Sequence, residues 1–167
     1  MTENFKEALA FVLEQEKGFS QSKADRGGAT NHGISLRFLQ GIDPAATVDT
    51  IKNLTRDEAA ELYWEHFWKA CKCSTLPVQL GVAVFDCAVN QGPGTARRLL
   101  QRTLKVKDDG YLGPVTLTAA LRCKLMPTLV DFLARRAKRY ALDDDEQIKT
   151  HGRGWFTRLF ELQLKVM

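Results

Sequence analysis

Residues 78–90, VQLGVAVFDCAVN, are apolar on nearly every side when they are placed on a helix. Such a helix has no face suited to water, so other elements of the fold have to surround it. Amphipathic segments that could do so fill much of the chain, from residues 2–16 to a final helix expected from about Trp155 to the end. The sequence therefore predicts a mainly α-helical protein, a bundle around one central buried helix.

One acid, Asp86, interrupts this apolar helix. A carboxylate in a protein interior is costly unless it is paired or hydrogen-bonded. We therefore expect Asp86 to make a structural hydrogen bond that fixes a neighbouring loop.

Local signals set further helix boundaries. TRDE, residues 55–58, is a capping box and predicts a helix that ends near Cys71. Gly113-Pro114 places a proline at the first position of another helix. MPT, residues 126–128, is expected to separate that helix from the next one, LVDFLARRAKRYAL.

The positive charge is concentrated in the C-terminal half. Residues 1–86 carry 9 Lys/Arg and 12 Asp/Glu, a net −3, and residues 87–167 carry 15 and 8, a net +7. This imbalance would favour a polyanionic partner such as nucleic acid, an anionic membrane or the bacterial cell wall. It is equally explained by solvated helix surfaces that bind no partner. The basic run on one predicted helix is open to the same alternatives, and we favour a solvated surface for its members Arg135, Arg136, Lys138 and Arg139.

The four cysteines match no zinc-binding spacing. We expect reduced, mostly structural thiols, with Cys87 inside the apolar helix and Cys71 and Cys73 nearer the surface. The N-terminus lacks the pattern of a secretory signal, and no apolar run approaches the roughly 20 residues of a membrane helix. The expectation is a protein made in the cytoplasm.

A glycine-rich segment follows the first helix and carries two acids, Glu16 and Asp25. Its Gly27-Gly28 and Asn31-His32-Gly33 predict a turn-rich loop or a short β-hairpin. Glu16 continues the apolar stripe of the first helix, where partial burial would raise its pKa, unless the helix has already frayed and the side chain reaches water. Two carboxyls in contrasting surroundings are the arrangement of glycoside hydrolysis, with Glu16 as acid and Asp25 as the ionised partner.

Several blocks resemble glycoside hydrolase family 108. EKGF, residues 16–19, and DRGGATNHGI, residues 25–34, are similar to its E-G-G-Y and D-P-G-G-A-T-N-Y-G-I elements. FDCAVNQGPG, residues 85–94, looks like F-D-x-A-V-N-x-G-P, and DGYLGPVT, residues 109–116, looks like its D-G-x-x-G-P-x-T segment of proposed peptidoglycan binding. The resemblance also takes in the aromatic pairs Tyr63-Trp64 and Phe67-Trp68, and Gly154-Trp155 with Arg158.

The resemblance implies a lysozyme-like α+β fold and N-acetylmuramidase activity, the hydrolysis of the β-1,4 bond between N-acetylmuramic acid and N-acetylglucosamine. It implies one domain over residues 1–167, with a catalytic motif region at 1–92 and a helical, proposed peptidoglycan-binding region at 93–167 that is not independent. Glu16 corresponds to the catalytic glutamate, and Asp25 and Thr30 complete a triad like that of phage-type lysozymes, with an Asp-to-Thr gap one residue shorter. The expected substrate contacts are Asn31, His32, Asn90, Gln91 and Tyr63.

The resemblance implies neither a metal nor an organic cofactor. The expected protein is a monomer that acts on peptidoglycan of the cell wall, in the periplasm, after release from the cytoplasm. A phage holin is the usual route of release, and an effector-type secretion system is another. Among the substitutions that depart from the family pattern are Lys17 for Gly, Arg26 for Pro and His32 for Tyr. A cation at residue 17 would favour the ionised form of Glu16 and so oppose the effect of burial on its pKa.

Three other functions remain open from the sequence. A lytic transglycosylase would need one acid and no water, so Asp25 and Thr30 would be dispensable. A non-catalytic wall-binding module would tolerate the loss of Glu16. A nucleic-acid binder would use the basic half and show a steep dependence of binding on salt.

Overall fold

The computed structural model describes residues 1–15 and 28–167. Helix α5 (Val78–Gln91) runs through the middle of the molecule, and every residue from Leu80 to Ala88 is buried. It packs against α1 (Glu3–Gln15) and α6 (Pro93–Thr103) and against two long helices, α8 (Leu125–Tyr140) and α9 (Asp145–Val166). The prediction of a helical protein around a central buried helix is confirmed.

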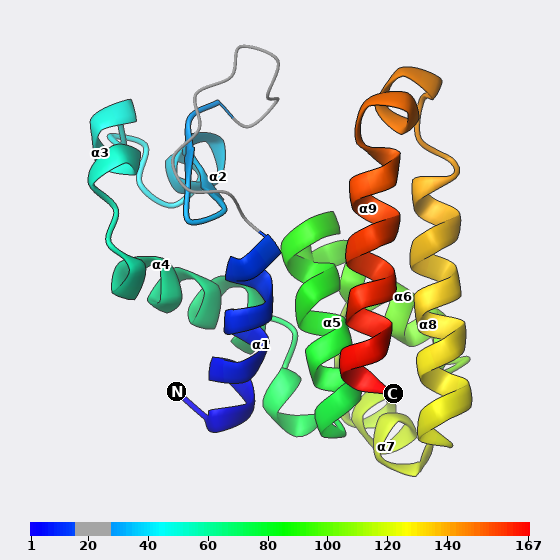
Figure 1. Ribbon diagram of the computed structural model, residues 1–167. Coiled ribbons are helices and arrows are strands. Elements are labelled where there is room, and N and C mark those ends of the chain that lie inside the picture. The colour runs from blue at the N-terminus through cyan, green and yellow to red at the C-terminus, as the bar shows by residue number, and fades with distance from the viewer. Residues whose placement is uncertain (16–27) are drawn as a thin grey trace.

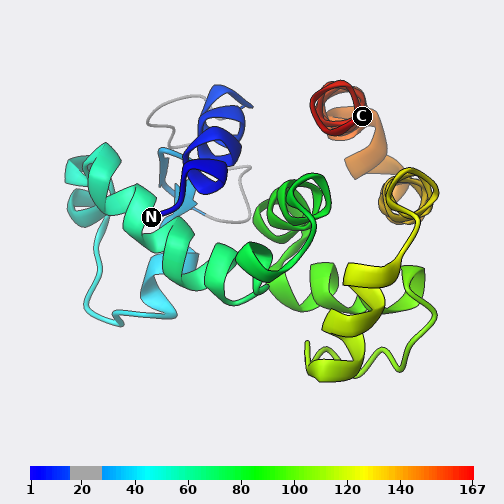
Figure 2. The same ribbon diagram turned by 90° about the horizontal axis from the view of Figure 1, so that it is seen from below.

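The remaining elements fall on two sides of α5. Figure 2 looks along α5, α8 and α9, with α1 and α4 on one side of α5 and the α8–α9 pair on the other. The further elements are α2 (Leu36–Gln40), α3 (Val48–Asn53), α4 (Arg56–Tyr63), a π-helix (Trp64–Lys69), a 3-10 turn (Cys73–Thr75) and α7 (Pro114–Arg122). Within the described residues, no helix is long and apolar enough to cross a membrane.

The predicted hairpin is present in the described part of the glycine-rich segment. Strands β1 (Thr30–Asn31) and β2 (Ile34–Ser35) pair antiparallel, with Thr30 opposite Ser35 and Asn31 opposite Ile34. The two turn residues, His32 and Gly33, have φ values of +49° and +76°. Positive φ at both positions is what a two-residue hairpin turn of right-handed twist requires.

The aromatic residues of the segment after the capping box mostly enter the core. Phe5 of α1 packs edge-on against Trp64, Trp68 and Phe85, with ring centroids 5.0, 5.4 and 5.7 Å away. These contacts join α1, the π-helix and α5, and each such pair adds about 0.5–1.5 kcal/mol beyond the burial of its area. The position of α1 is therefore set by the core.

One helix and two helix boundaries differ from the sequence expectations. Helix α3 lies in a stretch for which no helix was expected. Its capping box uses a second threonine, Thr50, opposite Thr47, where Glu or Gln is usual. Helix α8 starts at Leu125 and includes Met126-Pro127-Thr128. Pro127 is its third residue, where the missing N–H would have had no partner within the helix.

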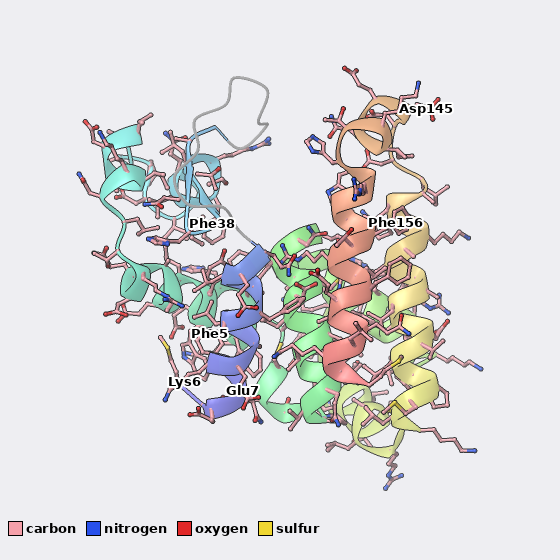
Figure 3. All side chains as sticks on the ribbon, in the orientation of Figure 1. Phe5, Lys6, Glu7, Phe38, Asp145 and Phe156 are labelled. Atoms are coloured by element: carbon pink, nitrogen blue, oxygen red, sulfur yellow. The ribbon has the colours of Figure 1, made fainter. Side chains whose placement is uncertain are left out.

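Helix α9 starts ten residues before the expected Trp155. The Asp144 carboxylate caps it by accepting a 2.8 Å hydrogen bond from the Gln147 N–H. Figure 3 shows Asp145 at the start of α9 and Phe156 further along the same helix, beside α8. The rings of Phe156 and Tyr140 meet edge-on at 5.8 Å, so packing against α8 supports a helix whose interior contains Gly152 and Gly154.

Three of the four cysteines are buried: Cys71, Cys73 and Cys87. Cys87 lies inside α5 as expected, whereas the expectation that Cys71 and Cys73 lie near the surface is wrong. Both are covered because the π-helix and the 3-10 turn pack against one another and against α5.

Candidate functional site

A cleft of about 690 Å³ opens where the C-terminal ends of α1 and α5 meet the first half of α9. Figure 1 shows the α8–α9 pair extending past the end of α5 on one side, with the hairpin and α2 on the other. The cleft is lined by Gln15, Asn90, Thr150, His151, Arg153, Gly154, Trp155, Thr157 and Arg158. A smaller cavity of about 180 Å³ shares Asn90 and Trp155 and is otherwise lined by Gln91, Arg139, Tyr140 and Asp143.

Gln15, the last residue of α1, connects the two sides of the cleft. Its side-chain amide donates a 2.7 Å hydrogen bond to Oε2 of Glu161 on α9. Gln15 lines the cleft and directly precedes Glu16 in the chain. Glu16 and Asp25, the predicted acids, lie outside the described residues, so their predicted roles are untested.

Trp155 is the main aromatic side chain of the cleft wall. Its ring stacks on that of Tyr140, with centroids 5.3 Å apart and 20° between the planes, and lies 5.8 Å from the ring of His151. An aromatic face backed in this way is rigid and suits contact with the apolar face of a sugar. The sequence comparison matched Trp155 but did not indicate a site role, because a helical position alone does not reveal which residues face a cleft.

The predicted residues of the hairpin form a separate group. Asn31 is buried, and its amide nitrogen donates to the carbonyl oxygens of Ile51, Lys52 and Leu54 at 3.1–3.3 Å. These bonds tie the hairpin to the C-terminal end of α3. The amide nitrogen of Asn31 is therefore already used within the fold.

Tyr63 and Thr30 complete this group. Tyr63 is fully buried, and its hydroxyl donates a 3.0 Å hydrogen bond to the backbone carbonyl of His32. Thr30 is half-buried, and its hydroxyl donates to the carbonyl of Gly28 at 3.4 Å. Tyr63 supports the hairpin from beneath, and the role of Thr30 in positioning a water remains a prediction.

Asn90 and Gln91, the predicted contacts at the end of α5, both reach a cavity. Oδ1 of Asn90 accepts a 2.6 Å hydrogen bond from the Tyr140 hydroxyl. The Gln91 side chain accepts from the Cys87 thiol at 3.6 Å. The structure thus places Asn90 in the cleft, and places Asn90 and Gln91 with Trp155 in the smaller cavity. All three are apart from the hairpin group of Asn31, His32 and Tyr63.

Asp86 is fully buried and paired with two arginines. Its carboxylate accepts from Nη2 of Arg136 at 2.8 Å and from Nε of Arg158 at 2.9 Å. The expectation that Asp86 is paired is confirmed, although its partners are guanidinium groups from α8 and α9. Arg136 was expected on a solvated face, and this is wrong for that residue, which is fully buried because Asp86 compensates its charge.

The loop expected to bind peptidoglycan is held by Gln101. The Gln101 amide donates to Oδ1 of Asp109 and to the carbonyl of Tyr111, and its oxygen accepts from the Gly110 N–H at 2.7 Å. Helix α7, which follows the loop, lies at the opposite end of the molecule from the first turns of α9. The predicted binding role of this loop remains a prediction.

The fold and the cleft define a lysozyme-like protein. The family model of glycosyl hydrolase 108 matches residues 9–92, half of the chain. The chain therefore belongs to the glycosyl hydrolase 108 family. This membership supports a glycoside hydrolase that acts on peptidoglycan.

The whole chain is similar to a solved structure of SagA from Brucella abortus. The TM-score is 0.91 at 28% sequence identity, and the match covers 97% of this chain and 92% of that one. No curated protein matches the chain in sequence. Because the match covers nearly the whole chain, it extends over both sides of α5 and includes α8 and α9.

Proposed function

We propose that the protein is an N-acetylmuramidase, which hydrolyses the β-1,4 bond between N-acetylmuramic acid and N-acetylglucosamine in peptidoglycan. The observation that carries this proposal is the cleft at the end of α1. It is bordered by Gln15, the residue before Glu16, and is lined by the stacking face of Trp155 and by Asn90. An aromatic face, an amide and an adjacent acid are the groups that binding and cleaving an N-acetylated glycan require.

In the proposed reaction, Glu16 is the general acid that protonates the glycosidic oxygen as the bond to the sugar breaks. Asp25 stays ionised and faces the positive charge that develops on the sugar ring, or orients the attacking water. Thr30 helps to hold that water through its hydroxyl. A protonated Glu16 near neutral pH needs a raised pKa, which a sugar bound over it would favour by excluding water.

The charge of the cleft suits the acidic groups of the substrate. Arg153 lines the cleft. Arg139 lines the smaller cavity, together with one acid, Asp143. Glycan strands of peptidoglycan carry carboxylates on their stem peptides, or on the lactyl group of N-acetylmuramic acid where the peptide is absent. Guanidinium groups beside the glycan would attract these carboxylates and raise the rate of association.

The test is digestion of purified peptidoglycan by the wild type and by Glu16→Gln, with mass spectrometry of the products. We expect the wild type to release muropeptides with reducing N-acetylmuramic acid ends. Glu16→Gln should lose at least about a hundredfold in rate while keeping its fold, since general acid catalysis contributes about 10²–10⁴-fold. Anhydro ends would assign the protein as a lytic transglycosylase, and equal activity of the two proteins would exclude Glu16 as the acid.

A further inference from the structure

The hydroxyl of Tyr140 lies between a buried arginine and the amide of Asn90. It is 3.3 Å from Nη2 of Arg136 and 2.6 Å from Oδ1 of Asn90. Nη2 of Arg136 also donates to Asp86 at 2.8 Å, so its two hydrogens serve the carboxylate and the phenol oxygen. A continuous chain of hydrogen bonds therefore runs from the buried Asp86 to Asn90 at the cleft.

The direction of each hydrogen bond in this chain is determined by chemistry. A guanidinium has only donors, so the Tyr140 oxygen has to accept from Arg136. The single phenolic hydrogen is then directed to Asn90, whose facing atom has to be the amide oxygen. A reversed amide would present a second donor to Tyr140 and leave the phenolic hydrogen without an acceptor, a loss of about 1–3 kcal/mol for a buried group.

The chain is rigid because its inner members are buried ions. Asp86 and Arg136 are fully buried, and Arg158 holds the second carboxylate oxygen of Asp86. Burial raises the pKa of Tyr140 above its ordinary value, although the neighbouring Arg136 acts in the opposite direction. The phenol therefore stays protonated and remains a donor to Asn90 throughout the neutral range.

Asn90 lines both the cleft and the smaller cavity and is half-buried. Its Oδ1 is held by Tyr140, and among the described residues no hydrogen bond engages its Nδ2. Trp155 lines the same two cavities and stacks on the Tyr140 ring. The free end of the amide therefore presents two hydrogens beside an aromatic surface.

We infer that Tyr140 is a positioning residue that locks the Asn90 amide as a donor, and that this site selects a sugar substituent with a hydrogen-free acceptor oxygen. Such an oxygen belongs to an acetamido carbonyl or to a carboxylate. A de-N-acetylated sugar presents an ammonium group at this position. Because the ammonium group and the Asn90 Nδ2 are both hydrogen-bond donors, the site disfavours this sugar. The inference rests on the proposed function for its substrate class, a glycan of N-acetylated sugars.

The test measures glycan binding in a Glu16→Gln background, where hydrolysis does not interfere. Titration calorimetry would compare Tyr140→Phe, Asn90→Ala and the double variant. We expect each single variant to bind about 3–10-fold more weakly, the range for one hydrogen bond. The double variant should bind no more weakly than Asn90→Ala, because Tyr140 acts through Asn90. In the active enzyme, Tyr140→Phe should raise KM by the same factor and change kcat less than about twofold.

Two ligands distinguish the sources of the acceptor. A hexamer of N-acetylglucosamine carries acetamido groups and no carboxylate, whereas soluble glycan strands with N-acetylmuramic acid carry both. Weakened binding of both ligands assigns the acetamido group, and weakened binding of the strands alone assigns the carboxylate. The Glu16→Gln protein should bind a partly de-N-acetylated hexamer more weakly than the fully N-acetylated hexamer. With Asn90→Ala added, the two hexamers should bind equally well.

Controls separate positioning from folding. Asn4→Ala, an exposed change in the first turn of α1, should leave binding unchanged, and thermal unfolding of each variant checks its fold. Additive losses in the double variant, an unchanged affinity in Asn90→Ala, or no binding of either glycan would overturn the inference. A wild type that binds glycan through Asn90 without hydrolysing it would refute the proposed function and leave the inference intact.

Discussion

The carboxylate of Asp86 and the guanidinium of Arg136 meet at 2.8 Å with both side chains fully buried, although the two residues are 50 positions apart in the chain. Arg158 approaches the other oxygen of Asp86 from 72 positions away. The three side chains come from α5, α8 and α9 and thus join the two long C-terminal helices to the central helix. Removing one member of such a cluster leaves uncompensated charge in the protein interior.

We therefore predict that Asp86→Asn lowers the free energy of unfolding by about 3–5 kcal/mol, the range for breaking a buried ion pair. Urea unfolding followed by circular dichroism would measure this change. The matched control is Asp131→Asn, which breaks the half-exposed Asp131–Arg135 pair of 2.9 Å on α8 and should alter stability by less than about 1 kcal/mol. Equal effects of the two variants would contradict a special role for the buried cluster.

The buried thiols should resist modification in the folded protein. Burial raises the pKa of Cys71 to about 12 and that of Cys87 to about 11, and it raises the pKa of Cys73 well above its ordinary value. Because the thiolate is the reacting species, little of it is present at pH 8. An aromatic disulfide reagent at pH 8 should therefore modify Cys123 rapidly in the native protein, and all four cysteines only in denaturant.

The raised pKa values of these thiols should make the free energy of unfolding fall with rising pH in the alkaline range. These thiols ionise near pH 9 in the unfolded chain and at higher pH in the folded one, so the folded state holds more protons above pH 9. Their contribution to stability is complete below pH 9 and is lost as the pH rises towards 11–12. Cys71→Ala should reduce the steepness of this loss in urea unfolding measured between pH 8.5 and 10.5, and an unchanged slope would contradict the assignment to Cys71.

The amide of Asn31 is predicted to stabilise the hairpin. Asn31→Asp keeps the size of the side chain but cannot donate to the three carbonyls at the end of α3, so it should lower the free energy of unfolding by about 1–3 kcal/mol. Asn53→Asp, an exposed change on α3 itself, is the control and should have little effect. If Asn31 instead acts only as a substrate contact, Asn31→Asp will change KM and leave the stability at its wild-type value.

We predict that the glycan stacks on the side chain of Trp155. Trp155→Ala should raise KM about 3–10-fold, equivalent to one aromatic contact, whereas Trp155→Phe should recover part of the loss. Phe160→Ala is the control on the same helix, since Phe160 is exposed and lines an apolar groove between α8 and α9 away from the cleft. Kinetics on soluble glycan strands would measure the change, and equal effects of Trp155→Ala and Phe160→Ala would refute the role of Trp155.

The elements with strong local signals were predictable from the sequence. The all-round apolar character of residues 78–90 predicted the central helix α5, and the Thr55 capping box predicted the start of α4. The glycine and asparagine pattern at residues 31–33 predicted a turn, and the structure confirms a hairpin there. In each case the decisive interaction lies within a few residues along the chain, where propensity and periodicity act.

The sequence by itself thus determined the helical class, the central helix, the hairpin turn and the family motifs around Glu16. Only the tertiary structure decided that Arg136 and Arg158 meet on Asp86, that Tyr140 holds Asn90, and that Trp155 faces the cleft. From the sequence, the basic residues between Arg135 and Arg139 are all equally expected to be solvated. Only the packing of the helices shows that Arg136 is buried against Asp86. The physical reason is that local patterns act over a few residues, whereas these contacts depend on how helices distant in sequence pack against one another.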